Sequence, residues 1–230
     1  VTLRFQPMVG SNLSQSVTIP AMGRYTLDAK TVAGLEAAEF STVIESDVPI
    51  VADRTMSWNQ TAYAAHTETS IAAPSTVWYL AEGATHSNFD LFYTIQNAND
   101  ADAHVTVRYL LPGGQAPIEK TYTFPASKRS NIWVDNERFP DNETGTTLLA
   151  ATDVSAKLTS DVPIIVERSM YLSTPGRFFG AGHNSAGVTE PGLNWLMSER
   201  ATGTYFDLFI LIANPGDADA AVRATYLLPG

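Results

Sequence analysis

The sequence predicts an all-β chain built from tandem antiparallel β-sandwich repeats, with a period of about 105–117 residues. Three observations lead to this prediction. The stretch 78–113 recurs at 195–230 without a gap and with 20 identical positions. A second stretch, 41–58, recurs at 155–172. Between them, short runs of alternating apolar and polar residues are separated by Asn, Asp, Gly and Pro, which is typical of strands and turns.

Residues 1–77 are predicted to be the back part of a first unit and its linker. The run at 1–5 alternates as a strand does. Other strands are predicted at 16–21, at 24–29, and on either side of a Ser-Asp-Val-Pro turn within 41–58. Residues 33–38 have a helical composition, but a single turn in a connection is the better interpretation. The Ala-, Thr- and Ser-rich residues 59–77 are typical of a loop between units.

Residues 78–194 are predicted to form a complete unit with its linker. Its strands are expected near 77–81, 89–97, 104–111, 118–125, 130–135, 154–159 and 163–172. The run at 89–97 has apolar residues on both faces, which predicts a central strand that is covered on both sides. The polar residues that follow it are predicted to form a tight hairpin loop. The glycine-rich residues 173–194 are predicted to be a loop.

The unit boundaries have two interpretations. In the first, 1–77 and 78–194 are followed by 195–230, the opening strands of a further unit. In the alternative phase, 1–104 and 105–230 are two sandwich domains. In either case we expect the chain to start and stop within a unit, as a window on a longer array would.

Composition excludes several classes of partner. The 230 residues carry a formal net charge of −10 and no cysteine. An acidic surface repels nucleic-acid phosphates and anionic lipids, so we expect neither as a partner. No apolar run approaches the roughly 18 residues of a membrane helix, so no membrane insertion is expected. The lack of cysteine fits a cytosolic or microbial surface protein better than a disulfide-rich secreted module.

Four sequence boxes resemble a tandem-repeat family of microbial cell-surface proteins. They are WYLAEG at 78–83, SDVPIIVERSMY at 160–171, GHNSAGV at 182–188 and NPGDAD at 214–219. The resemblance covers nearly the whole chain and implies immunoglobulin-like or related sandwich modules along extracellular stalks. It implies no catalytic residue. Arg200 stands where the first box has Gly83, and the first linker lacks the glycines, so neither feature is expected to serve a shared chemistry.

The repeated carboxylates are the first candidates for chemistry. Glu82 and Asp90 recur in the second copy, and paired carboxylates can act on glycosides or bind Ca²⁺. A turn cap, or an ion pair with an arginine such as Arg54 or Arg168, is the preferred interpretation, because every copy of a repeat needs its structural contacts.

Asp100 and Asp102 form a second acidic group, in the predicted hairpin loop. Their spacing is too sparse for an EF-hand, so turn chemistry is preferred. Weak Ca²⁺ binding that involves Glu82, Asp90, Asp100 and Asp102 is the open alternative, and no other cofactor is expected.

The histidines at 66, 86, 104 and 183 lack the spacing of metal ligands. His66 and His183 align with each other in the repeat, and hydrogen-bonded linker histidines are the preferred interpretation. Ser185 lies near His183, but no G-x-S-x-G elbow surrounds it.

Trp78 and Trp195 open the two copies of the longer repeat. Such rings can stack on sugars, but packing against the core or a neighbouring unit is preferred. N-glycosylation sequons begin at Asn12, Asn59 and Asn142, and their use depends on the source organism.

These observations predict a non-enzymatic structural repeat of an extracellular stalk, surface layer or filament. Its expected partners are neighbouring copies, which complete one another in tandem or by strand donation. The alternative is an adhesion module that binds carbohydrate or another surface polymer. An accessory domain of an enzyme is a third, weaker hypothesis.

Overall fold

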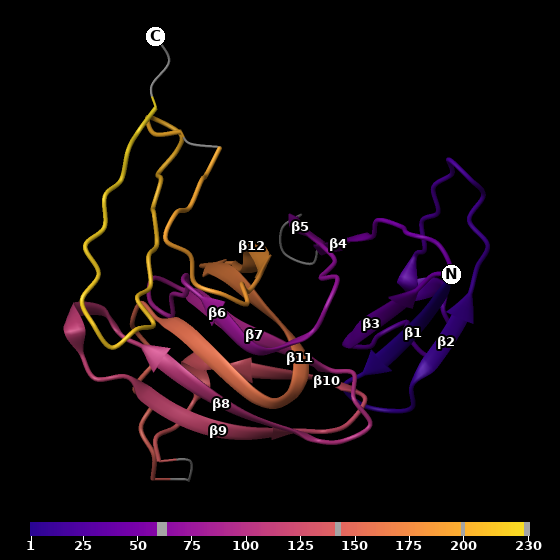
Figure 1. Ribbon diagram of the computed structural model, residues 1–230, viewed down its shortest axis with the longest axis horizontal. Coiled ribbons are helices and arrows are strands. Elements are labelled where there is room, and N and C mark those ends of the chain that lie inside the picture. The colour runs from indigo at the N-terminus through magenta and orange to yellow at the C-terminus, as the bar shows by residue number, and fades with distance from the viewer. Residues whose placement is uncertain (59–63, 141–143, 199–200, 228–230) are drawn as a thin grey trace.

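The computed structural model describes residues 1–58, 64–140, 144–198 and 201–227. Within these residues all strand pairs are antiparallel and no α-helix is present, which confirms the all-β prediction (Figure 1). No helix of the described chain is long and apolar enough to cross a membrane. The central part of the molecule, residues 75–186, contains β6 (Ser75–Leu80), β7 (Phe89–Asn97), β8 (Ala103–Leu110), β9 (Ile118–Phe124), β10 (Lys128–Trp133), β11 (Ser155–Thr174) and β12 (Arg177–Ala186).

Strand β11 organises the central part because it pairs with four other strands. Its first half lies between β8 and β6, and its second half lies between β7 and β12. The outer strands β9 and β10 extend the two halves through β8 and β7. Figure 1 shows β11 curling through the molecule, so that the sheet closes into a half-barrel around a single core.

The bend of β11 coincides with the predicted Ser-Asp-Val-Pro turn, and the prediction of a turn is wrong here. The strand continues through these residues instead of reversing. Ser160 Oγ accepts the Val162 N–H, while the Asp161 carboxylate accepts the His104 N–H at 2.8 Å. Pro163 has no N–H to donate to a ladder. The motif therefore supplies the hydrogen bonds that a strand loses when it bends from one side of the sheet to the other.

The core lies between the two halves of the curled sheet. Leu91, Tyr93 and Ile95 of β7 point into it, and the Tyr93 and Tyr109 rings stack across it at 6.3 Å. The alternate residues of β7, including Phe92, are half-buried on the other face. Since β7 lies between β10 and β11, the prediction of a central strand is confirmed, while its second face is only half-buried.

The predicted loops 59–77 and 173–194 are wrong in part, because much of each is strand. Strand β5 (Ala64–Thr69) and the start of β6 lie in the first, and β12 lies in the second. Gly182 of β12, and Gly187 just after its end, permit close packing and do not mark a flexible linker. A Cβ on Gly182 would lie 2.7 Å from the Tyr171 ring, and one on Gly187 would lie 3.0 Å from the Trp78 ring.

The N-terminal part, residues 1–69, contains β1 (Thr2–Pro7), β2 (Leu13–Ser16), β3 (Phe40–Glu45), β4 (Asp53–Trp58) and β5. Its ladders repeat those of the central part. Phe5 of β1 opposes Thr42 of β3, as Tyr109 opposes Ala156 at the repeat-equivalent positions. The β1–β2 ladder likewise has the register of β8–β9.

The β4–β5 hairpin corresponds in the same way to β11–β12. Met56 opposes His66, as Met170 opposes His183. Two local predictions fail: the strand expected at 16–21 lies at 13–16, and residues 24–29 form no strand. The second failure has a physical reason. Residues 24–29 correspond to β10, which pairs with β7, and β7 has no paired counterpart in the N-terminal part.

The C-terminal segment, residues 195–227, differs from its first copy. The prediction of opening strands is wrong for its described residues, which form no strand. Val105 and Tyr109 are fully buried, whereas their equivalents Val222 and Tyr226 are 62% and 67% exposed. Figure 1 shows the segment as extended coil beyond the half-barrel. The strands β6, β7 and β8 form where β11 is available to pair with them.

Trp78 and Trp195 occupy equivalent positions in the two copies, so they test whether burial depends on pairing with β11. Trp78 is 2% exposed and its indole N–H donates to the Ile164 carbonyl at 2.9 Å, whereas Trp195 is 59% exposed. We expect Trp78→Phe to lower the free energy of unfolding by about 2 kcal/mol, through lost volume and an unpaired carbonyl. Trp195→Phe should leave the urea midpoint of dilute protein unchanged. Equal midpoints for the two variants would contradict the different burial of the two copies.

Candidate functional site

The four candidate Ca²⁺ ligands do not converge. Asp90 lies at the start of β7, and Asp100 and Asp102 lie in the loop beyond its other end, roughly 25 Å away along the strand. The Asp102 carboxylate accepts the Ala126 N–H at 2.9 Å, which is turn chemistry. In the described part of the chain, no three His, Asp or Glu side chains are grouped so as to hold a metal ion.

Glu82 forms the ion pair with Arg168 that the sequence favoured. The distance between its Oε2 and Arg168 Nη2 is 2.6 Å, and the Arg168 side chain is only 6% exposed. His183 Nε2 lies 3.6 Å from the other carboxylate oxygen. Burial lowers the pKa of both Arg168 and His183, and Glu82 opposes this effect. This cluster fixes the segment after β6 to β11 and β12.

Asp90 and Asp135 form a second, half-buried group beside Trp133. Burial raises the pKa of Asp90, and it raises the pKa of Asp135 to about 6. The Leu91 N–H donates to Asp135 Oδ2 at 2.9 Å, and the Trp133 indole N–H donates to Asp90. Both carboxylates are therefore engaged in tying the start of β7 to the residues after β10.

The predicted linker histidines lie in strands. His66 is buried in β5 and neither ring nitrogen has a hydrogen-bond partner among the described residues; burial lowers its pKa. His183 lies in β12, within the Glu82 cluster. Of the sequons, Asn12 is exposed, while Asn59 and Asn142 lie outside the described residues. Trp78 is buried and has no ring face available for a sugar.

The largest constellation that sequence reasoning missed is the contact between the N-terminal and central parts. Arg54 Nη2 lies 2.6 Å from Glu167 Oε2 and 2.7 Å from Asn184 Oδ1. The Trp58 indole N–H donates to the Phe179 carbonyl at 2.5 Å. These bonds join the β4–β5 hairpin to β11 and β12, and we call this contact the junction.

Aromatic rings extend the junction over the outer face of the half-barrel. Trp58 packs edge-on against Tyr171 at 5.5 Å, and His66 lies 6.3 Å from the same ring. Tyr171 stacks on Phe179 at 4.7 Å and contacts Phe92. The cluster thus spans five strands or loops from two parts of the chain. Its only sequence signal was Arg54, an arginine within a strand pattern that needs a carboxylate partner.

The junction has a second polar contact at its other end. Gln96 Nε2 donates to Gln6 Oε1 at 2.9 Å. Glu39 forms an ion pair with Arg129 at 2.5 Å and accepts a hydrogen bond from Asn131 at 2.9 Å. The N-terminal part therefore contacts the outer face of β7 and β10 as well as β11 and β12.

Glu68 of β5 also lies at the junction, and its carboxyl group has a shifted pKa. Burial, followed by the like charge of Glu167, raises the pKa of Glu68 in β5. The Glu68 carboxylate accepts the Ala186 N–H at the end of β12. Two carboxylates thus face one guanidinium, that of Arg54, at the junction.

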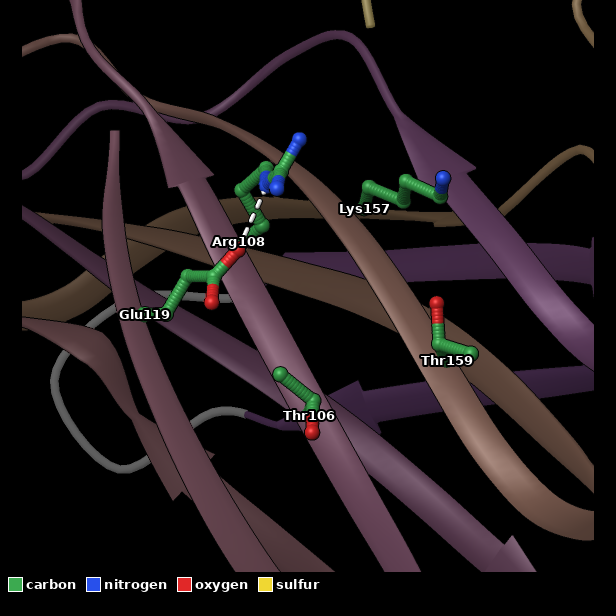
Figure 2. A pocket seen from close by; sticks show the side chains of 5 residues that line it. All are labelled: Thr106, Arg108, Glu119, Lys157 and Thr159. Atoms are coloured by element: carbon green, nitrogen blue, oxygen red, sulfur yellow. Dashed lines mark hydrogen bonds and ion pairs between the residues drawn. The ribbon is translucent and has the colours of Figure 1, made fainter. Parts of the chain in front are cut away.

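A shallow hollow of about 270 Å³ lies on the outward face of β8, β9 and β11. Figure 2 shows its lining, with the Arg108–Glu119 ion pair at 2.6 Å and Lys157 on the neighbouring strand. Lys157 Nζ lies 5.8 Å from the centre of the Tyr79 ring. These charges already have partners and lie on an open sheet face, so the hollow has the character of a solvated surface.

The buried Glu82–Arg168 pair predicts a clear difference between two glutamate variants. Glu82→Gln leaves the buried guanidinium without its counter-charge, so we expect the free energy of unfolding to fall by about 2 kcal/mol. Glu119→Gln, at the exposed pair with Arg108, should leave it unchanged. Urea denaturation at pH 7 measures both, and equal stabilities for the two variants would rule out a structural role for the Glu82 cluster.

No family profile matches the sequence, and a comparison with curated proteins finds no significant match. Several solved structures are similar in part, including the following two. The Anabaena sensory rhodopsin transducer has 26% identity and a TM-score of 0.36 over 43% of this chain and 99% of its own. Thermotoga maritima 1070 has 15% identity and a TM-score of 0.43 over 52% and 97%. Both TM-scores lie below 0.5, so neither neighbour assigns a function to this chain.

Proposed function

We propose that this chain is a non-enzymatic structural repeat of an extracellular stalk, surface layer or filament. The observation that carries the proposal is the shared register of equivalent ladders: β1–β2–β3 follows β8–β9–β11, and β4–β5 follows β11–β12. The same arrangement of paired strands thus occurs twice in the chain, which supports tandem sandwich units. The immunoglobulin-like form, the unit boundaries and the cell-surface location belong to the same proposal.

The junction is the mechanical element in this proposal. Repeat proteins transmit geometry from one unit to the next through nearest-neighbour contacts. Here Arg54 and Trp58 of one unit contact Glu167, Asn184 and the Phe179 carbonyl of the next. Directional hydrogen bonds together with stacked rings set the angle between units more narrowly than apolar packing alone.

The double variant Arg54→Ala/Trp58→Ala tests the junction. Loss of its polar bonds should release the N-terminal part, raise the radius of gyration in small-angle X-ray scattering, and abolish regular spacing of assemblies in negative-stain micrographs. The control Arg108→Ala/Trp195→Ala removes the same residue types outside the junction and should change neither readout. If negative-stain micrographs of the unaltered protein at high concentration showed nothing but dispersed single particles, the structural role would be contradicted.

A second candidate function, adhesion to carbohydrate, is favoured by one observation. Trp133 is 39% exposed and lies 5.2 Å from Phe92, and Phe178 is also exposed on the same aromatic surface. An exposed ring with a carboxylate beside it, here Asp90, offers both stacking and hydrogen bonding to a sugar. This surface replaces Trp78 as the candidate sugar platform.

A glycan array with the intact chain and with Trp133→Ala separates the two functions. Adhesion predicts saturable binding that falls at least 10-fold in Trp133→Ala and is unchanged in Trp195→Ala, with both variants folded by circular dichroism. The structural proposal predicts no saturable binding by any of the three proteins.

A further inference from the structure

The ladder between β7 and β11 has two unpaired counterparts elsewhere in the chain. Strand β4 corresponds to the second half of β11, but in the described residues it pairs only with β5. Its other edge corresponds to the edge of β11 that β7 occupies. Residues 206–214, FDLFILIAN, correspond to β7, FDLFYTIQN, and form no strand. Among the described residues, both the β4 edge and residues 206–214 therefore lack the ladder partner that their equivalents have.

The side chains of 206–214 fit the buried face of this ladder. Leu91 and Tyr93 of β7 are fully buried, and their equivalents are Leu208 and Ile210. Ile210 is 37% exposed here, and Phe209 is 77% exposed. An extended segment with exposed apolar residues and an unpaired strand edge are the two components of β-strand addition.

The hairpin loop after this segment is already formed. Asn214 Nδ2 donates to the Ala218 carbonyl at 2.7 Å, and its Oδ1 accepts the Gly216 N–H at 3.0 Å. Asn97 makes the equivalent bonds with Ala101 and Asn99 at the end of β7. The end of the donor segment therefore already has the conformation that it has in the paired copy.

We propose that residues 206–214 of one copy of this chain pair with β4 of a second copy, in the register of β7 and β11. This inference rests on the proposed structural function and names its partner. By the β7–β11 register, Phe209 opposes Thr55, Leu208 opposes Met56, and Ile210 lies beside Arg54 on the core side. The partner lies on a second copy because residues 214–217 of the same chain lie against the end of β8.

The geometry of this contact determines the form of the assembly. The donor segment and the acceptor edge are different surfaces, so each copy gives to one neighbour and receives from another. Such a head-to-tail contact produces an open chain of copies when the rotation between neighbours does not close, and a ring when it does. In the open form, strand addition joins units of different copies into the filament that the proposed function requires.

Cysteine pairs test the register directly, because the native chain contains no cysteine. Thr55→Cys protein is mixed with isotope-labelled Phe209→Cys protein under mild oxidation, and Met56→Cys is mixed with Leu208→Cys. Adjacent opposed pairs alternate between hydrogen-bonded and closer non-hydrogen-bonded positions, so one of the two mixtures has the shorter separation. The control mixes Thr55→Cys with Leu211→Cys, a diagonal pair whose Cα atoms lie about 7–8 Å apart, too far for an unstrained disulfide.

We expect mixed disulfides, identified by mass, in at least one in-register mixture at a yield at least 5-fold above the control. Equal yields in control and in-register mixtures, or no mixed disulfide in either in-register mixture, would overturn the inference. A Thr55→Cys/Phe209→Cys double variant that links only within monomers would also overturn it, in favour of closure within one chain. These failures would leave the junction scattering result intact, so they are distinguishable from failure of the proposed function.

Discussion

Pairing with β11 is the interaction on which the rest of the structure depends. Both edges of this strand are occupied, by β8 and β6 in its first half and by β7 and β12 in its second. The same sequence pattern behaves differently where such a partner is missing. The C-terminal segment carries 20 of the 36 residues of its first copy, yet its described residues form no strand. Whether a segment of this chain forms a strand thus depends on a partner strand. This is expected when burial against neighbouring side chains outweighs the intrinsic β-propensity of the residues.

The two copies of the longer repeat share their local hydrogen bonds, although the second copy lacks the long-range bonds of the first. The repeated residues can therefore be divided into two sets. The Asn97 and Asn214 loops have equivalent bonds although only the first joins two strands. Trp78 and Trp195 both donate to the carbonyl three residues earlier, but only Trp78 reaches Ile164. The repeated residues therefore include a local set that shapes turns and a long-range set that needs β11.

The sequence predicted the strands of the central part well because alternation and turn residues are local signals. It misread the Ser-Asp-Val-Pro segment as a turn, because polar caps and a proline are equally compatible with a turn and with a strand that bends from one side of a sheet to the other. It misread the glycines of β12, since Gly182 is required by the Tyr171 ring and composition does not show a tertiary neighbour. The Glu82–Arg168 pair was foreseen from repeated charges, whereas the junction was not. Its partners are separated by more than 100 residues, as in the pair Arg54 and Glu167, and no local pattern links them.

The two equivalent arginines have different partners, and one of them joins the N-terminal part to the central part. Arg168 forms an ion pair with Glu82 within the central part and is almost fully buried. Arg54, at the equivalent position, opposes Glu68 within the N-terminal part and forms its ion pair with Glu167 of the central part. The position of Arg54 in β4 places it beside residues 206–214 of a second copy, the segment proposed to pair with this strand. The strand proposed to pair with β4 places the apolar Ile210 beside this guanidinium, so Glu167 keeps its role as the counter-charge of Arg54.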